Sequence, residues 1–171
     1  MKDVFLVYDT SCFYEIVILN YFMSFSKCDV VLCSPDGKSI RTMEGYSVNV
    51  DMALEEVKKE KLRSFIVPGG NISAIDNEEV WTFLRELEKK NVLTAGICAG
   101  VDVLDHAGIL TDRKSTHSAD LDLVNDRNVI TARANAYVDF AIETAKELGL
   151  FAGEEDIRET IDFWKNYKRV Q

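Results

Sequence analysis

The sequence is short of positive charge and of paired cysteines. Its 20 lysines and arginines stand against 29 aspartates and glutamates, a formal net charge of −9. Because nucleic acid is bound by clustered basic residues, this balance argues against a nucleic-acid partner. The four cysteines, Cys12, Cys28, Cys33 and Cys98, show no Cys-x-x-Cys spacing, which argues against a disulfide framework and against a zinc site. We therefore expect reduced thiols, no metal and no cofactor.

The chain also lacks a long apolar run, an internal repeat and a low-complexity linker. No stretch approaches bilayer length, and Met1-Lys2-Asp3 leads directly into a short apolar run rather than into a signal peptide. We therefore expect a cytoplasmic protein with no membrane partner. With 171 residues and 47% hydrophobic content, the sequence predicts one domain, residues 1–171, that buries its own core.

Short apolar runs alternate with segments that have helical spacing of apolar residues. The runs predict strands at residues 4–7, 30–33, 65–67, 92–95 and 129–131, and a pair of short strands within 39–50. Helices are expected at residues 13–25, 51–59, 80–90, 99–108, 136–148 and 154–167. Buried strands that alternate with helices indicate an α/β fold, with a parallel sheet covered by helices on both faces.

The most informative segment is Gly96-Ile97-Cys98-Ala99-Gly100, which follows an apolar strand and opens a helix. This pattern is a nucleophile elbow with cysteine at its centre, where small neighbours let the strand and helix backbones come close together. The N-terminus of a helix favours a thiolate, so Cys98 is predicted to be the reactive thiol. Cys12, Cys28 and Cys33 are expected to be small buried hydrophobes.

Loops at the carboxyl ends of parallel strands meet at one edge of the sheet. The loops after residues 7, 67 and 95 carry Glu15, Pro68-Gly69-Gly70 and Cys98. Glu15 has apolar neighbours, and we expect its carboxyl to lie beside Cys98. Backbone N–H groups of a glycine turn are suited to hold an oxyanion, because no Cβ obstructs them.

Taken together with Ser115-Thr116-His117 and residues 128–141, these motifs resemble the DJ-1/PfpI (ThiJ/PfpI) superfamily over nearly the whole chain. The resemblance implies a flavodoxin-like, three-layer α/β/α sandwich related to the class I glutamine amidotransferase domain. It also implies a mostly parallel central sheet and a homodimer.

The resemblance further implies roles for individual residues. Cys98 would be the nucleophile, Glu15 its hydrogen-bonding acid, and His117 an assisting residue. Gly70 and Ala99 would supply the oxyanion hole, with Gly69 beside them. The resulting hypothesis is attack by a Cys98 thiolate on a small carbonyl substrate, with a protonated Glu15 as proton donor.

Two departures narrow the choice of branch. The peptidase-like branch carries histidine where this chain has Ala99, and the isocyanide hydratases carry aspartate near the position of Glu15. A glyoxalase or deglycase activity is therefore favoured, while a PfpI-like amidase or peptidase and an oxidative-stress sensor without turnover stay open. Asp102 stands where relatives have apolar residues, and its spacing predicts a pair with His106 one turn on.

Overall fold

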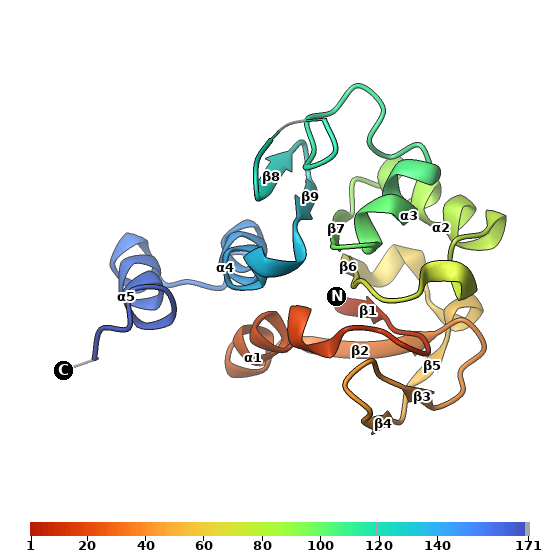
Figure 1. Ribbon diagram of the computed structural model, residues 1–171, viewed down its shortest axis with the longest axis horizontal. Coiled ribbons are helices and arrows are strands. Elements are labelled where there is room, and N and C mark those ends of the chain that lie inside the picture. The colour runs from red at the N-terminus through yellow and green to blue at the C-terminus, as the bar shows by residue number, and fades with distance from the viewer. Residues whose placement is uncertain (119, 170–171) are drawn as a thin grey trace.

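The computed structural model describes residues 1–118 and 120–169. Its centre is a seven-stranded sheet with the strand order β5-β2-β1-β6-β7-β9-β8 (Figure 1). The strands are β1 (Lys2–Leu6), β2 (Asp29–Ser34), β5 (Met52–Ala53), β6 (Leu62–Val67), β7 (Leu93–Ile97), β8 (Leu123–Asp126) and β9 (Val129–Ala132). All neighbouring pairs are parallel except β8 with β9. The predicted, mostly parallel sheet is confirmed.

Helices cover both faces of the sheet and bury a separate apolar cluster on each. On one face lie α1 (Val17–Phe25) and α4 (Tyr137–Glu147), and on the other lie α2 (Glu78–Lys89) and α3 (Gly100–His106). The central strands are apolar on both sides because each face is covered: every residue of β7 and β9 is buried. The fold is therefore the expected three-layer α/β/α sandwich.

Local sequence signals explain where several helices begin and end. Asn77 caps α2, since its side-chain oxygen accepts hydrogen bonds from the N–H groups of Glu79 (3.1 Å) and Val80 (3.2 Å). Glu78 and Glu79 then place negative charge at the positive end of the helix dipole. Gly149, with φ of 64°, follows the end of α4 in the left-handed conformation that glycine adopts readily.

Other boundaries differ from those that the sequence predicts. Residues 51–59, expected to be a helix, form β5, a 3-10 turn (Leu54–Glu56) and the start of a second 3-10 turn (Lys59–Lys61), because a short parallel pairing with β2 replaces helical hydrogen bonds. The first helix is divided into a 3-10 turn, η1 (Phe13–Glu15), and α1. β8 was not expected, whereas the pair of short strands is present as β3 (Ile40–Arg41) and β4 (Ser47–Val48).

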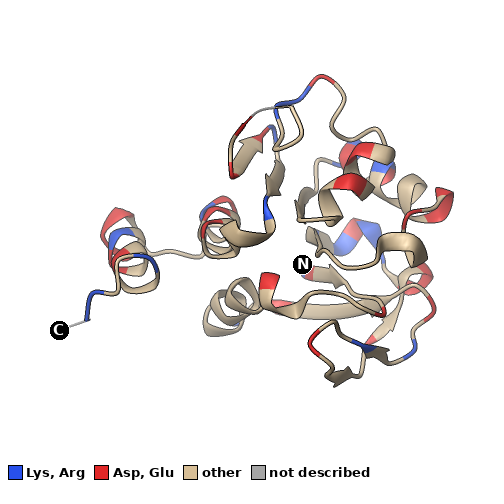
Figure 2. Cartoon of the chain, in the orientation of Figure 1, with Lys and Arg blue, Asp and Glu red and all other residues tan. Residues whose placement is uncertain are grey.

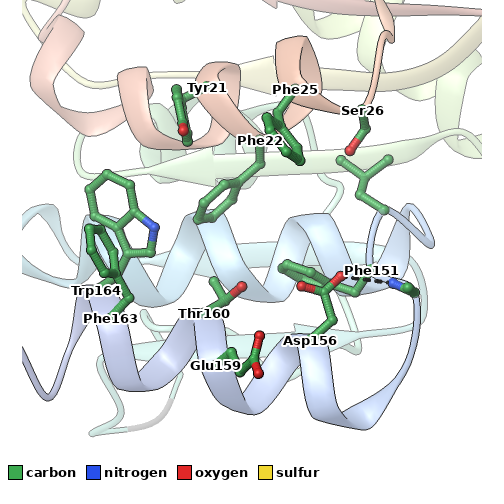
Figure 3. Close-up of a pocket in the computed structure, with 12 residues that line it drawn as sticks. Tyr21, Phe22, Phe25, Ser26, Phe151, Asp156, Glu159, Thr160, Phe163 and Trp164 are labelled. Atoms are coloured by element: carbon green, nitrogen blue, oxygen red, sulfur yellow. Dashed lines mark hydrogen bonds between the residues drawn. The ribbon is translucent and has the colours of Figure 1, made fainter. Parts of the chain in front are cut away.

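The last helix, α5 (Glu154–Trp164), lies apart from the sheet at one end of the molecule (Figure 1). None of its residues is buried, and Trp164 is its main anchor, with its ring 5.8 Å from that of Phe22 on α1. A groove of about 540 Å³ lies between α1 and α5. Aromatic side chains from both helices line it (Figure 3). Aromatic side chains thus join the two helices, and Ile161 and Trp164 of α5 pack against the same apolar cluster as α1.

Charged residues are spread over the surface, and one ion pair with a buried acid lies at the edge of the sheet. Acidic and basic segments are interspersed along the chain (Figure 2). At the amino end of β1, the fully buried carboxylate of Asp3 is bound by the guanidinium of Arg63 (Nε at 2.9 Å) and by the hydroxyl of Ser64 (2.7 Å).

Among the described residues, no helix has the length and apolar character needed to cross a membrane.

Candidate active site

The strand–turn–helix geometry predicted around Cys98 is present in the structure. Cys98 follows β7 directly and has φ of 56°, a conformation that is uncommon for a residue with a Cβ. Its N–H donates to the carbonyl of Ala132 at the end of β9 (2.9 Å), which fixes the turn to the sheet. A Cβ on Gly100 would lie 2.1 Å from the carbonyl oxygen of Val67, so only glycine lets α3 begin this close to β6.

Glu15 is a buried acid at the same edge of the sheet, only 1% exposed. The N–H of Gly69 donates to its Oε2 (2.6 Å), and the hydroxyl of Tyr14 donates to its Oε1 (3.3 Å). Across the described parts of the chain, no lysine, arginine or histidine forms an ion pair with it. Burial raises the pKa of Glu15 above its ordinary value, although hydrogen bonds with Gly69, Cys98 and Tyr14 act against that rise.

Gly69 lies between the acid and the thiol. A Cβ built on Gly69 would be 2.9 Å from Sγ of Cys98 and 3.0 Å from Oε2 of Glu15. The structure therefore brings Glu15 and Cys98 together around a residue that has no side chain. Both polar groups of Gly69 are occupied, since its carbonyl also accepts the N–H of Cys12 (2.9 Å).

The thiol of Cys98 differs from the sequence-based expectation of a readily formed thiolate. Burial raises its pKa, and the negative charges of Glu15 and Asp102 act in the same direction. The N–H of Ala99 donates to the sulfur and lowers the pKa, which is the effect expected at a helix N-terminus. Burial of the sulfur and the two nearby acids outweigh that effect, so the pKa of Cys98 lies above its ordinary value.

The glycine turn and the elbow position the residues expected to hold an oxyanion. Gly70 has φ of 138°, and a Cβ there would lie 2.4 Å from the carbonyl oxygen of Thr10. Ala99 places its N–H at the Cys98 sulfur. The N–H of Gly69, in contrast, is already bound by Glu15, so Gly69 shapes the site rather than offering a free donor.

His117 lies against α3, beside two of its aspartates. Its Nε2 is 3.2 Å from Asp102 and its Nδ1 is 3.5 Å from Asp105. The expected pair of Asp102 with His106 is wrong: His106 turns to Asp76 instead (2.9 Å). The loop that carries His117 folds back over α3, a long-range approach that helical spacing does not reveal.

Residues that the sequence reading treated as ordinary also belong to the site. Cys12, expected to be a small buried hydrophobe, is half-buried, and burial together with the charges of Glu15 and Cys98 raises its pKa to about 11. The fully buried Tyr8 donates from its hydroxyl to the carbonyl of Pro68 (2.9 Å) and so supports the glycine turn. Their places in the loop after β1 are the signal that could have identified them. In the described chain, no three histidine, cysteine or acidic residues are grouped to hold a metal ion.

The fold and the elbow together define a class: three-layer α/β proteins with a cysteine at the end of a central parallel strand. The chain belongs to the DJ-1/PfpI family, whose family model matches residues 1–147. The suspected superfamily is thereby confirmed, and α5 lies outside the matched part.

Proteins similar to this chain in sequence carry different names. The chain is 28% identical over 162 residues to "Uncharacterized protease YoaZ" of Bacillus subtilis, with 83% of this chain and 74% of the relative covered. It is 32% identical over 90 residues to "Deglycase TK1284" of Thermococcus kodakarensis, covering 52% of this chain and 54% of that relative. The match thus spans about half the length of this deglycase.

Solved structures support the fold. The DJ-1 superfamily protein Atu0886 from Agrobacterium tumefaciens superposes with a TM-score of 0.87 at 24% identity, covering 98% of this chain and 100% of that one. A thiJ/pfpI family protein from Bacillus anthracis gives a TM-score of 0.85 at 22% identity, with 98% and 91% covered. At these identities the likeness concerns the fold alone.

Proposed function

We propose that this protein is an enzyme that uses Cys98 to attack small electrophilic carbonyl compounds, in the manner of a glyoxalase or deglycase. One observation carries the proposal: a buried carboxyl without a cation, Glu15, meets a thiol on a nucleophile elbow across Gly69. Such a carboxyl holds its proton readily and can give it to a developing oxyanion. The family members named deglycases support this choice of substrate class.

The chemistry begins with a proton shared by the acid and the thiol. Because the two groups titrate together, the first proton to leave makes one anion that both side chains stabilise. Cys98 as thiolate forms a C–S bond to the carbonyl carbon, and the electron pair of the C=O bond moves to oxygen. The N–H groups of Ala99 and Gly70 stabilise this oxyanion, and the proton on Glu15 passes to it, giving a hemithioacetal and a carboxylate.

For a 2-oxoaldehyde, the Glu15 carboxylate is then available as a base. It removes the proton from the carbon bonded to sulfur, which gives an enediolate. The proton then returns to the neighbouring carbon and the hydroxyl proton moves to the neighbouring oxygen, which yields a thioester of a 2-hydroxy acid. Water hydrolyses the thioester and restores the Cys98 thiol. No cofactor is needed, because the oxidation of one carbon is balanced by the reduction of its neighbour.

The test is turnover of methylglyoxal, measured beside a panel of amides, peptides and isocyanides. We expect methylglyoxal consumption by the wild type and its loss in Cys98→Ser, with Cys33→Ser as the matched control in a buried thiol away from the site. Cleavage of peptides without methylglyoxal consumption would overturn the proposal in favour of a peptidase. Uptake of peroxide oxygen at Cys98 without turnover of any substrate would favour the stress sensor.

Self-association is a second part of the proposal. One face of the η1–α1 segment exposes Tyr14 (43%), Val17 (48%), Tyr21 (55%) and Phe25 (80%), which recur at helical spacing. An apolar stripe of this kind is typical of an interface, and we propose that a second copy covers it in a cytoplasmic homodimer. Light scattering should report a dimer for the wild type and a monomer for Tyr21→Lys. A wild-type monomer at every concentration would contradict this part.

A further inference from the structure

The turn between β3 and β4, residues 42–46, is docked onto the loop that follows β1. The N–H of Thr10 donates to the carbonyl of Arg41 (2.7 Å), and the N–H of Met43 donates to the carbonyl of Ser11 (3.0 Å). These backbone hydrogen bonds join two segments that are far apart in the sequence. They fix the turn beside the loop that leads into η1 and its acid.

Glu44 is the acid of this turn, and it lies directly against η1. Its Oε1 accepts the N–H of Tyr14 (2.9 Å), the residue next to Glu15. Burial acts to raise the pKa of Glu44, but hydrogen bonds from the backbone of Tyr14 and from Thr42 outweigh it and hold that pKa below its ordinary value. The exposed carboxyl of Glu44 is therefore ionised at neutral pH.

The negative charge of Glu44 is not balanced by an ion pair. Among the described residues, no lysine, arginine or histidine lies within ion-pair distance of it. Arg41 belongs to the same hairpin, but its Nη1 donates to the hydroxyl of Ser47 (3.3 Å). The charge of Glu44 acts on the site, because it raises the pKa of both Glu15 and Cys12.

A continuous set of contacts leads from this turn to the reactive thiol. Glu15 accepts the N–H of Gly69 (2.6 Å), and the carbonyl of Gly69 accepts the N–H of Cys12 (2.9 Å). A Cβ built on Gly69 would lie 2.9 Å from Sγ of Cys98. A charge that acts on Glu15 therefore also acts on a charged molecule that approaches Cys98.

We propose that Glu44 is a specificity-determining residue that favours positively charged over anionic carbonyl substrates at Cys98. This inference rests on the proposed function and deepens it, because it names the charge of the substrate that the thiol attacks. A surface of one sign attracts molecules of the opposite sign and repels those of its own sign. Asp102 adds to the same field from α3, since its charge also acts on Cys98.

The first experiment compares two methanethiosulfonates in their reaction with Cys98, one carrying a trimethylammonium group and the other a sulfonate group. Peptide mass spectrometry assigns the modified cysteine. The ratio of the two rates is normalised to the ratio for a small thiol in solution, so it does not depend on the pKa of Cys98. In the wild type we expect this normalised ratio to favour the cation by about tenfold.

Glu44→Gln removes the charge and keeps an oxygen that can accept from the N–H of Tyr14. We expect it to lower the normalised ratio about threefold. The matched control is Asp9→Asn, because Oδ1 of Asp9 also accepts a backbone N–H of the hairpin, that of Arg41 (2.7 Å).

Asp9 is exposed but lines a separate hollow with Ser34 and Lys38. Its substitution should therefore leave the ratio within about 1.5-fold of the wild type. An unchanged ratio in Glu44→Gln, or equal falls in the two variants, would overturn the inference.

Ionic strength gives a readout that a purely structural role of Glu44 would not change. Raising the salt concentration from about 0.05 M to about 0.5 M should bring the wild-type ratio towards that of Glu44→Gln, because salt screens exposed charges. A wild-type ratio that does not respond to salt would show that the shape of the reagents, and not their charge, separates them, and the inference would fail.

Turnover extends the comparison to substrates. The values of kcat/KM are measured for methylglyoxal, which is neutral, and for 2-oxoaldehydes that carry a trimethylammonium or a phosphate group. In the wild type we expect the cation to be preferred and the anion to be disfavoured, with a narrower spread in Glu44→Gln. A preference for the anion would overturn the inference. If no 2-oxoaldehyde is consumed, the proposed function fails, while the methanethiosulfonate ratios still decide the role of Glu44.

Discussion

Asp3 and Glu15 are equally buried carboxyl groups at opposite ends of the central sheet, and their partners differ completely. Asp3 is 0% exposed and Glu15 is 1% exposed. Asp3 meets the guanidinium of Arg63 and the hydroxyl of Ser64, so its negative charge is balanced where it stands. Glu15 meets an amide, a phenol and a thiol, none of which carries positive charge at neutral pH.

The difference shows which of the two acids suits the proposed chemistry. A buried carboxylate that is paired with a cation and fully hydrogen-bonded is held in its ionised form, so it has a structural role and no proton to donate. A buried carboxyl without a cation is pushed toward its protonated form, and that proton becomes available to a reacting neighbour. Burial alone therefore does not identify the functional acid, whereas burial without a compensating charge does.

The largest expected effect is on stability at the structural end. Asp3→Asn leaves Arg63 without its carboxylate, and we expect the free energy of unfolding to fall by about 2 kcal/mol, a value at the low side for a buried pair because Arg63 is partly exposed. Urea denaturation measures the loss. The control is Glu15→Gln, which breaks no ion pair, and an equal or greater loss in that variant would remove the distinction between the two acids.

The next effect concerns the thiol at the functional end. Glu15→Gln keeps a donor that can face the sulfur, whereas Glu15→Leu removes it and leaves the N–H of Gly69 buried and unpaired. Since a hydrogen bond to a charged group contributes on the order of 1.5 kcal/mol, Cys98 should alkylate about tenfold faster in Gln than in Leu. Identical pH profiles in wild type, Gln and Leu would show that Glu15 does not contact the sulfur.

A third test uses the pH dependence of stability. The folded-state pKa of Glu15 lies above its unfolded value, so its favourable contribution is complete below about pH 4.3 and is lost as pH rises through the folded pKa. Glu15→Gln does not titrate, and its stability relative to the wild type should increase over that window. Thermal unfolding across pH 4 to 8 measures the difference. A constant difference would indicate a Glu15 pKa that folding leaves unchanged.

The smallest effect is expected from Tyr14. Its hydroxyl donates to Glu15 at 3.3 Å from a residue that is 43% exposed, so the bond is long and water competes for it. Tyr14→Phe should lower stability by no more than about 0.5 kcal/mol and change the rate of Cys98 alkylation by about twofold at most. A change greater than that of Glu15→Gln would mean that the tyrosine, and not the burial of the acid, governs the site.

Most strands and helices could be predicted from the local pattern of apolar residues. The wrong assignments lie where strand pairing between distant parts of the chain decides the structure. Strands of the central sheet were predictable because each is a short apolar run, buried on both faces. Residues 51–59 contain good helix formers, and only the proximity of β2 draws Met52–Ala53 into the sheet. β8 was missed since it is short, partly exposed and stabilised by its antiparallel partner β9.

The candidate site was predictable in its parts and unpredictable in its electrostatics. The glycines on either side of Cys98 predict the turn that holds it. Because loops at the carboxyl ends of parallel strands meet at one edge of the sheet, the positions of Glu15 and Gly69 near Cys98 were also predictable. The raised pKa of Cys98 was not foreseen, because it depends on burial and on the distance to Glu15 and Asp102. The partners of His117 depend in the same way on how a long loop returns over α3.

The absence of a Cβ at Gly69 affects how mutational scanning data for this protein should be interpreted. An added methyl group would collide with Cys98 and Glu15 at once, so alanine at this position displaces both side chains without removing any of their atoms. Gly70 and Gly100 meet backbone oxygens at even shorter range. We therefore expect a fitness map to rank these three positions with Cys98, and their scores would report occupied volume rather than the loss of a reactive group.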